Sequence, residues 1–176
     1  MSEPEVWLRG PIPDVPAMLQ PVAHGLLQCR QEVRATVPTL TAAQLFMRPG
    51  EAATAGYHVR HAIGSLDRLF TYARGQQLSP EQLAALKMES QSDQSEGAQA
   101  ALVAQFDAAV ERSLAQLRAT DPATLLEPRE VGRARLPSTV LGLLFHAAEH
   151  TQRHVGQLVT TAKVLRTAPR PVARDD

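Results

Sequence analysis

The sequence contains only one cysteine, Cys29, and aromatic residues make up only 4% of its 176 residues. A single cysteine can form no disulfide within the chain, and it excludes a zinc site built on four cysteines. A surplus of one charge is missing as well, because 18 lysines and arginines balance 18 aspartates and glutamates. The sequence therefore has no basic surplus for nucleic acid and no lysine-rich run for a membrane surface.

Long hydrophobic runs are also missing. No apolar stretch approaches the ~20 residues that cross a bilayer. Residues 1–16 carry acids and prolines where a signal peptide would have a basic region followed by an apolar one. We therefore expect a cytoplasmic protein that binds neither nucleic acid nor a membrane.

What the sequence does contain is four long segments in which apolar residues recur every three or four positions, the spacing of one face of an α-helix. Four amphipathic helices with substantial connections predict an all-α fold, namely a four-helix bundle with at least one long crossover connection. We expect one domain over residues 1–176, with the bundle at about 14–166 and mobile tails at both ends. The predicted helices cover about 16–37, 54–74, 95–118 and 138–166.

The connections carry local signals of their own. Ser138 is the expected N-cap of the last helix. In "SPEQLAALK", Ser79 is followed three residues later by Gln82, which predicts a short capped helix. The segment "ESQSDQSEG" (89–97) reads as a polar loop, and "EPREVGRARLP" (127–137) as irregular or briefly extended.

Five of the six histidines fall in two clusters, and the denser cluster is "HAAEHTQRH" (146–154). A turn of ~100° per residue places His154 at the edge of the buried stripe, His150 beside it and His146 toward solvent. Residues four apart have neighbouring side chains, so His150 and His154 can reach one metal ion. The zinc-protease pattern "HExxH" is not matched, because Glu149 precedes His150.

A third metal ligand has to come from another segment, because a catalytic metal usually takes three protein ligands. The second cluster, "YHVRHAIGSLDRL", offers His58 and His61. Periodicity mildly favours His58 as the inward residue. The alternative is that these are ordinary surface or boundary histidines, although imidazoles beside a core are costly because each needs hydrogen-bond partners.

These motifs resemble the DinB-like superfamily. "HAAEHTQRHVGQL" is similar to its last-helix signature, and "LTAAQLFMRPG" with "GYHVRHAIGSLDRLFTYARG" is similar to its second-helix region. The resemblance covers about residues 14–166. It implies a four-helix bundle that holds a divalent metal (zinc, nickel or iron) on His61, His150 and His154. The motif thus disagrees with the periodicity over the second-helix ligand; we follow the motif and keep His58 as the alternative.

Further candidates surround this predicted site. His58, His146 and Glu149 are candidates for catalysis or for orienting the ligands, and an exposed helix face is the alternative for Glu149. Arg68 and Tyr72 project at nearly the same angle as His61 and are candidates for binding an anionic substrate group. An ordinary ion pair for Arg68 and packing for Tyr72 are the alternatives. The last candidates are His24, for substrate binding, and Gln157, for orienting a ligand.

The resemblance also implies a function. Relatives in the superfamily are similar to transferases and isomerases that use a low-molecular-weight thiol, and others to hydrolases. We therefore expect a metal-dependent enzyme acting on a small molecule, with a thiol cosubstrate and a homodimeric state as further implications. A buried core position is the expected role of Cys29. The alternatives are a non-catalytic metal-binding or dimerising bundle, and a metal-free bundle whose histidines respond to pH.

Overall fold

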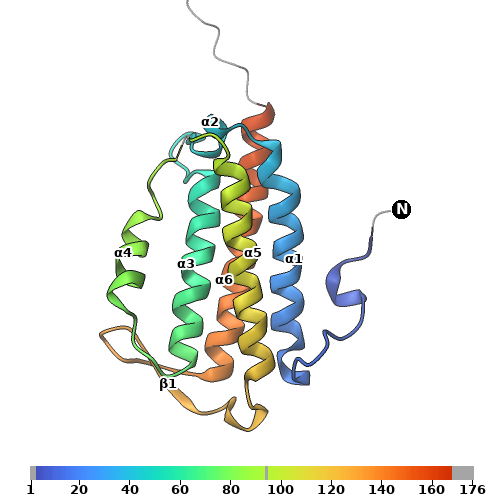
Figure 1. Ribbon diagram of the computed structural model, residues 1–176, viewed down its shortest axis with the longest axis vertical. Coiled ribbons are helices and arrows are strands. Elements are labelled where there is room, and N and C mark those ends of the chain that lie inside the picture. Colours follow the sequence, from blue (N-terminus) through green and yellow to red (C-terminus); the bar gives the residue numbers. More distant parts are fainter. Residues whose placement is uncertain (1–2, 94, 168–176) are drawn as a thin grey trace, which may run out of the picture.

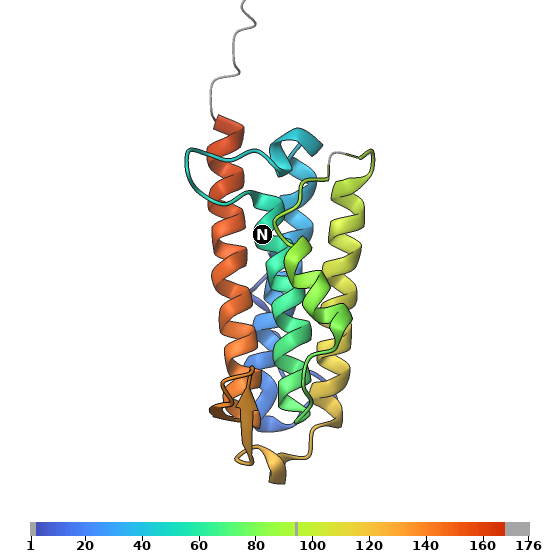
Figure 2. The same ribbon diagram turned by 90° about the vertical axis from the view of Figure 1, so that its left-hand side faces the viewer.

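Four long helices lie side by side in the computed structural model, which describes residues 3–93 and 95–167 (Figure 1). Both α5 and α6 pack against α1 and α3, so α1 and α3 are diagonal to each other. The second view agrees, with α6, α3 and α5 in a row and α1 behind them (Figure 2). The predicted all-α four-helix bundle is confirmed. The four helices are α1 (Gln20–Thr36), α3 (Ala55–Ala73), α5 (Ala98–Ala119) and α6 (Val140–Thr167).

The connection between α3 and α5 crosses the full length of the bundle. Helices α1 and α6 run in one direction and α3 and α5 in the other, so residues 74–97 must return from one end to the other (Figure 1). The predicted long crossover is therefore present. The other two connections each stay at one end of the bundle. The short helices outside the bundle are η1 (Val6–Leu8), η2 (Ala17–Leu19), η3 (Val37–Thr39), α2 (Ala42–Leu45), α4 (Pro80–Met88) and η4 (Pro122–Thr124).

Helix α4 lies within the crossover, on the outside of α3 (Figure 2). Ser79 and Gln82 form the predicted capping box at its start. The Gln82 amide also donates to Oδ2 of Asp67 at 2.7 Å and to Oγ1 of Thr71 at 2.8 Å. These bonds attach the crossover to α3 and so direct the chain that follows α4 back toward the bundle.

The connection before α6 takes the briefly extended form that was one of the two sequence expectations. Strands β1 (Pro128–Val131) and β2 (Leu136–Thr139) form a two-stranded antiparallel hairpin. Ser138 belongs to β2, and the hydroxyl of Thr139 accepts the backbone N–H of Gly142 at 3.0 Å. The prediction of Ser138 as N-cap was therefore wrong by one residue, because the strand continues up to the first turn of α6.

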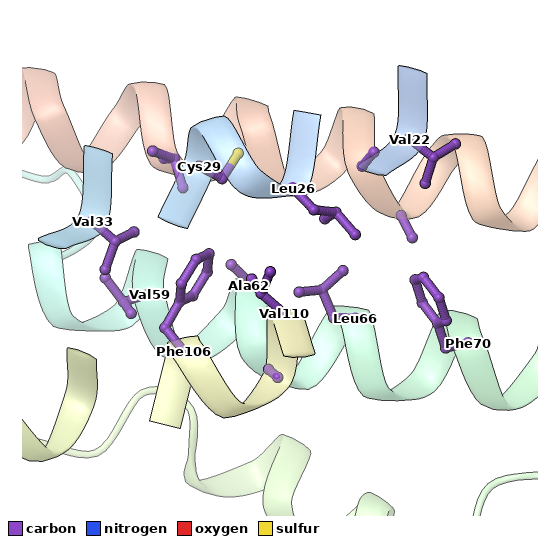
Figure 3. Close-up of a cluster of buried hydrophobic side chains, with 14 of the residues drawn as sticks. Val22, Leu26, Cys29, Val33, Val59, Ala62, Leu66, Phe70, Phe106 and Val110 are labelled. Carbon is purple, nitrogen blue, oxygen red and sulfur yellow. The ribbon is translucent and has the colours of Figure 1, made fainter. Parts of the chain in front are cut away.

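Apolar side chains from all four helices form one core. Phe106 is fully buried at its centre, and Figure 3 shows side chains of α1, α3 and α5 turned toward one another. Cys29 is part of this core, as expected. Burial, and then the charge of Glu32, raises the pKa of the Cys29 thiol to about 12. This thiol is thus neither exposed nor ionised at neutral pH.

Across residues 3–93 and 95–167, none of the helices combines the length and the apolar character that a bilayer crossing requires. The C-terminal tail predicted over 168–176 lies outside the described residues.

Candidate metal centre

Four histidines meet where α3 packs against α6. His58 and His61 come from α3, and His150 and His154 come from α6. Each pair lies about one turn apart on its own helix, so both members project toward the same interface. Antiparallel packing of the two helices brings the pairs together. The cluster is thus a product of the bundle, with neither helix sufficient alone.

Three of these rings are close enough to share one ion. One ring nitrogen each of His61, His150 and His154 lies within 4.8 Å of the other two. Nε2 of His61 is 3.0 Å from Nε2 of His150. Two nitrogens that each bind a zinc ion at 2.0–2.1 Å lie no more than about 4 Å apart. The separation of the two Nε2 atoms therefore fits a shared ion.

The hydrogen bonding of the cluster also fits a cation. Two ring nitrogens in hydrogen-bond contact need one proton between them. A metal cation that accepts the lone pairs of both nitrogens can replace that proton. Nδ1 of His150 is buried and has no hydrogen-bond partner among the described residues. One nitrogen of the cluster is thus left without a partner among the described residues, which is unusual for a buried polar atom.

Burial keeps three of these rings, those of His58, His150 and His154, neutral. Burial, followed by the nearby His61 and His150 rings, lowers the pKa of His154 to about 4. Burial is also the main reason that the pKa of His150 and of His58 is lowered. Imidazole binds a metal only through an unprotonated nitrogen. His150 and His154 are therefore ready to act as ligands at neutral pH.

His58 belongs to the cluster but not to the group of three. Its Nδ1 lies 3.1 Å from Nδ1 of His154, and its side chain is buried. Periodicity indicated that His58 points inward, and the structure agrees. His61 nevertheless reaches His150, because α6 passes close to the edge of the apolar face of α3. The motif thus identified His61 as a member of the group of three, and the periodicity identified His58 as the buried histidine.

The other nitrogen of His61 contacts a residue that sequence reasoning missed. Nδ1 of His61 is 2.6 Å from Oε2 of Glu89. Glu89 follows α4 at the start of the predicted polar loop, yet its side chain is only 7% exposed. Burial alone would raise its pKa, but hydrogen bonds from His61 and Arg68 outweigh burial, so the pKa of this carboxyl is lowered. No periodic pattern in the sequence marks Glu89.

An aromatic ring covers His61 on one side. The ring of Tyr57, four residues earlier on α3, stacks on His61 with centroids 5.4 Å apart and an interplanar angle of 15°. It also forms T-shaped contacts with the rings of His58 and His154. Tyr57 was not among the predicted site residues, although its position one turn before His61 was a signal for this contact.

Comparison with known families agrees with this geometry. Residues 26–158 match the DinB superfamily. The chain belongs to the DinB superfamily. The matched region includes all of α3 and α5 and both histidine pairs, and the resemblance inferred from the sequence is confirmed. The superfamily includes metal-binding proteins. No curated protein matches the chain at a significant level.

Two residues expected at the mouth of this DinB site have other roles. Nη1 of Arg68 donates to Oε1 of Glu89 at 2.6 Å, and the pair is largely buried. Tyr72 is 8% exposed and packs in the core. The expectation that they bind an anionic substrate is therefore not supported. The alternatives, an ion pair for Arg68 and packing for Tyr72, describe both correctly.

The remaining candidates lie at the rim or farther away. Nδ1 of His146 is 3.3 Å from Glu149, and both side chains are well exposed. Glu149 also pairs with Arg153, so it contacts rim residues instead of orienting the central ligands. His24 lies on α1, where its Nε2 contacts the carbonyl oxygen of Gly10 at 2.9 Å. That bond attaches the N-terminal segment to α1, far from the histidine cluster in the sequence, and the substrate contact of His24 stays a prediction.

Two hollows lie beside the cluster, at the end of the bundle where α3 begins. One, of about 240 Å³, is lined by Arg48, Thr54, Tyr57 and Ser90 together with Ala53. The other is a more open groove of about 680 Å³, whose walls include His58 and Gln157. Ala53 borders both hollows. The larger groove thus reaches His58 directly, whereas the smaller hollow reaches Tyr57, the ring that stacks on His61.

Proposed function

We propose that His61, His150 and His154 hold a divalent cation (zinc, nickel or iron) and that the protein is a metal-dependent enzyme acting on a small molecule. One observation carries this proposal: three ring nitrogens from two helices lie within 4.8 Å of one another. Membership of a superfamily that includes metal-binding proteins supports it.

A site of this composition suits catalysis, because three protein ligands leave a coordination position for another molecule. When bound there, the cation supplies Lewis-acid chemistry, lowering the pKa of a water or thiol that binds to it. The protein's own groups hold the site: His58 contacts Nδ1 of His154, and Tyr57 covers one face of His61. The reaction class we propose is a thiol-dependent transfer or isomerisation, or a hydrolysis.

A reacting thiol has to come from outside the chain. Cys29 is the only cysteine, it lies in the core, and its pKa is raised to about 12. Since the thiolate is the reactive form, this side chain neither reaches a substrate nor ionises near neutral pH. A low-molecular-weight thiol cosubstrate, bound in one of the two hollows beside the cluster, fits these facts.

Metal analysis of protein purified without a histidine tag tests the site. We expect about one zinc, nickel or iron ion per chain, either as purified or after titration. His61→Ala, His150→Ala and His154→Ala are each expected to lose it. His24→Ala removes an imidazole from α1 and is expected to retain the ion. A wild-type protein that takes up none of these metals contradicts the proposal.

Activity assays separate an enzyme from a metal-binding bundle without catalysis. The loaded protein is tested for conjugation and hydrolysis with and without added low-molecular-weight thiols. We expect turnover that His154→Ala abolishes. A protein that binds one metal ion per chain but shows no turnover in any of these assays would be a metal-binding protein. That result would contradict the proposed enzymatic function.

A further inference from the structure

A buried chain of three side chains runs from Arg68 through Glu89 to His61. Oε1 of Glu89 accepts from Nη1 of Arg68, and Oε2 lies against Nδ1 of His61, both at 2.6 Å. We propose that Glu89 is a positioning residue for the metal site and that Arg68 holds Glu89 in place. The proposal rests on the proposed function in so far as His61 is a metal ligand.

The reason lies in the two nitrogens of the His61 ring. A neutral imidazole has one protonated nitrogen and one with a free lone pair. A carboxylate can only accept, so Glu89 requires the proton on Nδ1 and leaves the lone pair on Nε2. Nε2 is the atom that faces His150. Glu89 thus fixes both the direction of the ring and the nitrogen offered to a cation, as carboxylates beside metal-binding histidines commonly do.

Gly64 provides the space for this arrangement. His61, Gly64 and Arg68 lie on one face of α3, at intervals of three and four residues. A Cβ atom at position 64 would stand 2.2 Å from Oε1 of Glu89 and 2.6 Å from Nη1 of Arg68. Any larger residue would therefore displace the Arg68–Glu89 pair.

The crossover connection is secured to α3 on both sides of His61. Arg68 holds it at Glu89, and one turn before Gly64 the Arg60 guanidinium donates to the carbonyl of Gln91 and lies 3.5 Å from Asp93. Gln82 ties α4 to the same helix. The crossover therefore delivers Glu89 to His61 from a fixed backbone.

The protein contains a second Arg–Glu–His set that serves as a matched comparison. On the exposed face of α6, Glu149 contacts both Arg153 and His146. The Glu149 side chain is 38% exposed, against 7% for Glu89. Water screens such exposed pairs, so they hold a ring weakly. Position and burial, not residue types, distinguish the two sets.

A merely structural role for the Arg68–Glu89 pair makes different predictions. If the pair only fastens α4 to α3, its loss lowers thermal stability and leaves the His61 ring and its metal affinity unchanged. If the pair positions His61, the ring and the affinity change as well. The protonation of the two ring nitrogens is the deciding quantity.

The experiment compares wild type, Glu89→Gln, Gly64→Ala and the control Glu149→Gln. Zinc affinity is measured by competition with a chromophoric chelator, and ¹⁵N NMR of the metal-free proteins reports which His61 nitrogen carries the proton. We expect the proton on Nδ1 in wild type. We expect zinc affinity to fall about 10- to 100-fold in Glu89→Gln, with a fall in the same direction in Gly64→Ala and a changed His61 tautomer in both. Glu149→Gln is expected to match wild type in both measurements.

Two results would overturn the positioning role. One is wild-type zinc affinity in Glu89→Gln, and the other is an unchanged His61 tautomer in that variant. A wild type that binds none of zinc, nickel and iron contradicts the proposed function instead. The NMR measurement then still decides whether Glu89 sets the His61 ring, because it uses the metal-free protein.

Discussion

Nε2 of His61 lies 3.0 Å from Nε2 of His150, although 89 residues separate them in the sequence. The contact depends on the antiparallel packing of α3 and α6, and on Glu89, which contacts the other nitrogen of the His61 ring. Because the two helices also form part of the core, the geometry of the site and the stability of the bundle are linked.

Zinc is expected to stabilise the folded protein. A ligand that binds only the folded state adds about 2.7 kcal/mol at one hundred times its dissociation constant. The midpoint temperature of thermal unfolding of the wild type is therefore expected to rise steadily as the zinc concentration increases. His24→Ala should show the same rise. An equal rise in His154→Ala would show that zinc acts somewhere other than this cluster.

The metal-free protein is expected to lose stability as the pH falls from about 6.5 through about 4. The pKa of His154 is about 4 in the folded protein, against an ordinary value of 6.5, so the unfolded chain takes up the proton first. A lowered pKa means that the stabilisation is complete above 6.5 and is lost as the pH falls. His150 acts in the same direction.

Urea unfolding in the presence of a chelator, at a series of pH values, measures this dependence. The variant His154→Gln, which has no proton to gain, is expected to show a shallower fall in stability over the same range. Identical pH profiles for wild type and His154→Gln would rule out the assigned contribution.

Phe106 is expected to be among the most sensitive core positions. It is completely buried, and truncation of such a ring leaves a cavity. We expect Phe106→Ala to lower the free energy of unfolding by about 3–5 kcal/mol. Phe145 on α6 is 60% exposed, so Phe145→Ala should change it by less than about 0.5 kcal/mol. Denaturant unfolding of both variants checks the contrast, and equal losses would contradict the packing described.

Two helical glycines are expected to respond to alanine in opposite ways. A Cβ on Gly56 would stand 2.4 Å from Cε1 of Phe46, whereas a Cβ on Gly156 meets nothing within 4 Å. We expect Gly56→Ala to destabilise the protein by about 1–3 kcal/mol through overpacking. Gly156→Ala is expected to stabilise it by about 0.5–1 kcal/mol, because alanine has the higher helix propensity. Their unfolding midpoints should lie on opposite sides of the wild-type value.

Local patterns in the sequence predicted the helices well. Apolar periodicity located all four long helices, and the Ser79–Gln82 pair located α4, since these signals depend on residues within a few positions of one another. The start of α6 was displaced by one residue. Thr139 and Ser138 are both good capping residues, and only the pairing of β2 with β1 decides between them.

The candidate site was predictable in part. Four-residue spacing suggested a metal site, and the angle of each histidine relative to the apolar stripe selected His150 and His154 and set His146 apart. Both signals reflect the geometry of one helix. It could not choose between His58 and His61, since that choice depends on where α6 crosses α3. The structure brings His61 into the group of three and places His58 against His154.

The sequence by itself determined that this is a helical bundle with histidine clusters on two of its helices, because periodicity and spacing are properties of single segments. Only the tertiary structure decided which histidines meet, and it added Glu89. That carboxylate resembles any other acid in a polar stretch until the crossover, anchored by Arg68 and accommodated by Gly64, carries it to His61. Contacts between distant segments depend on how the helices pack, and no local pattern encodes them.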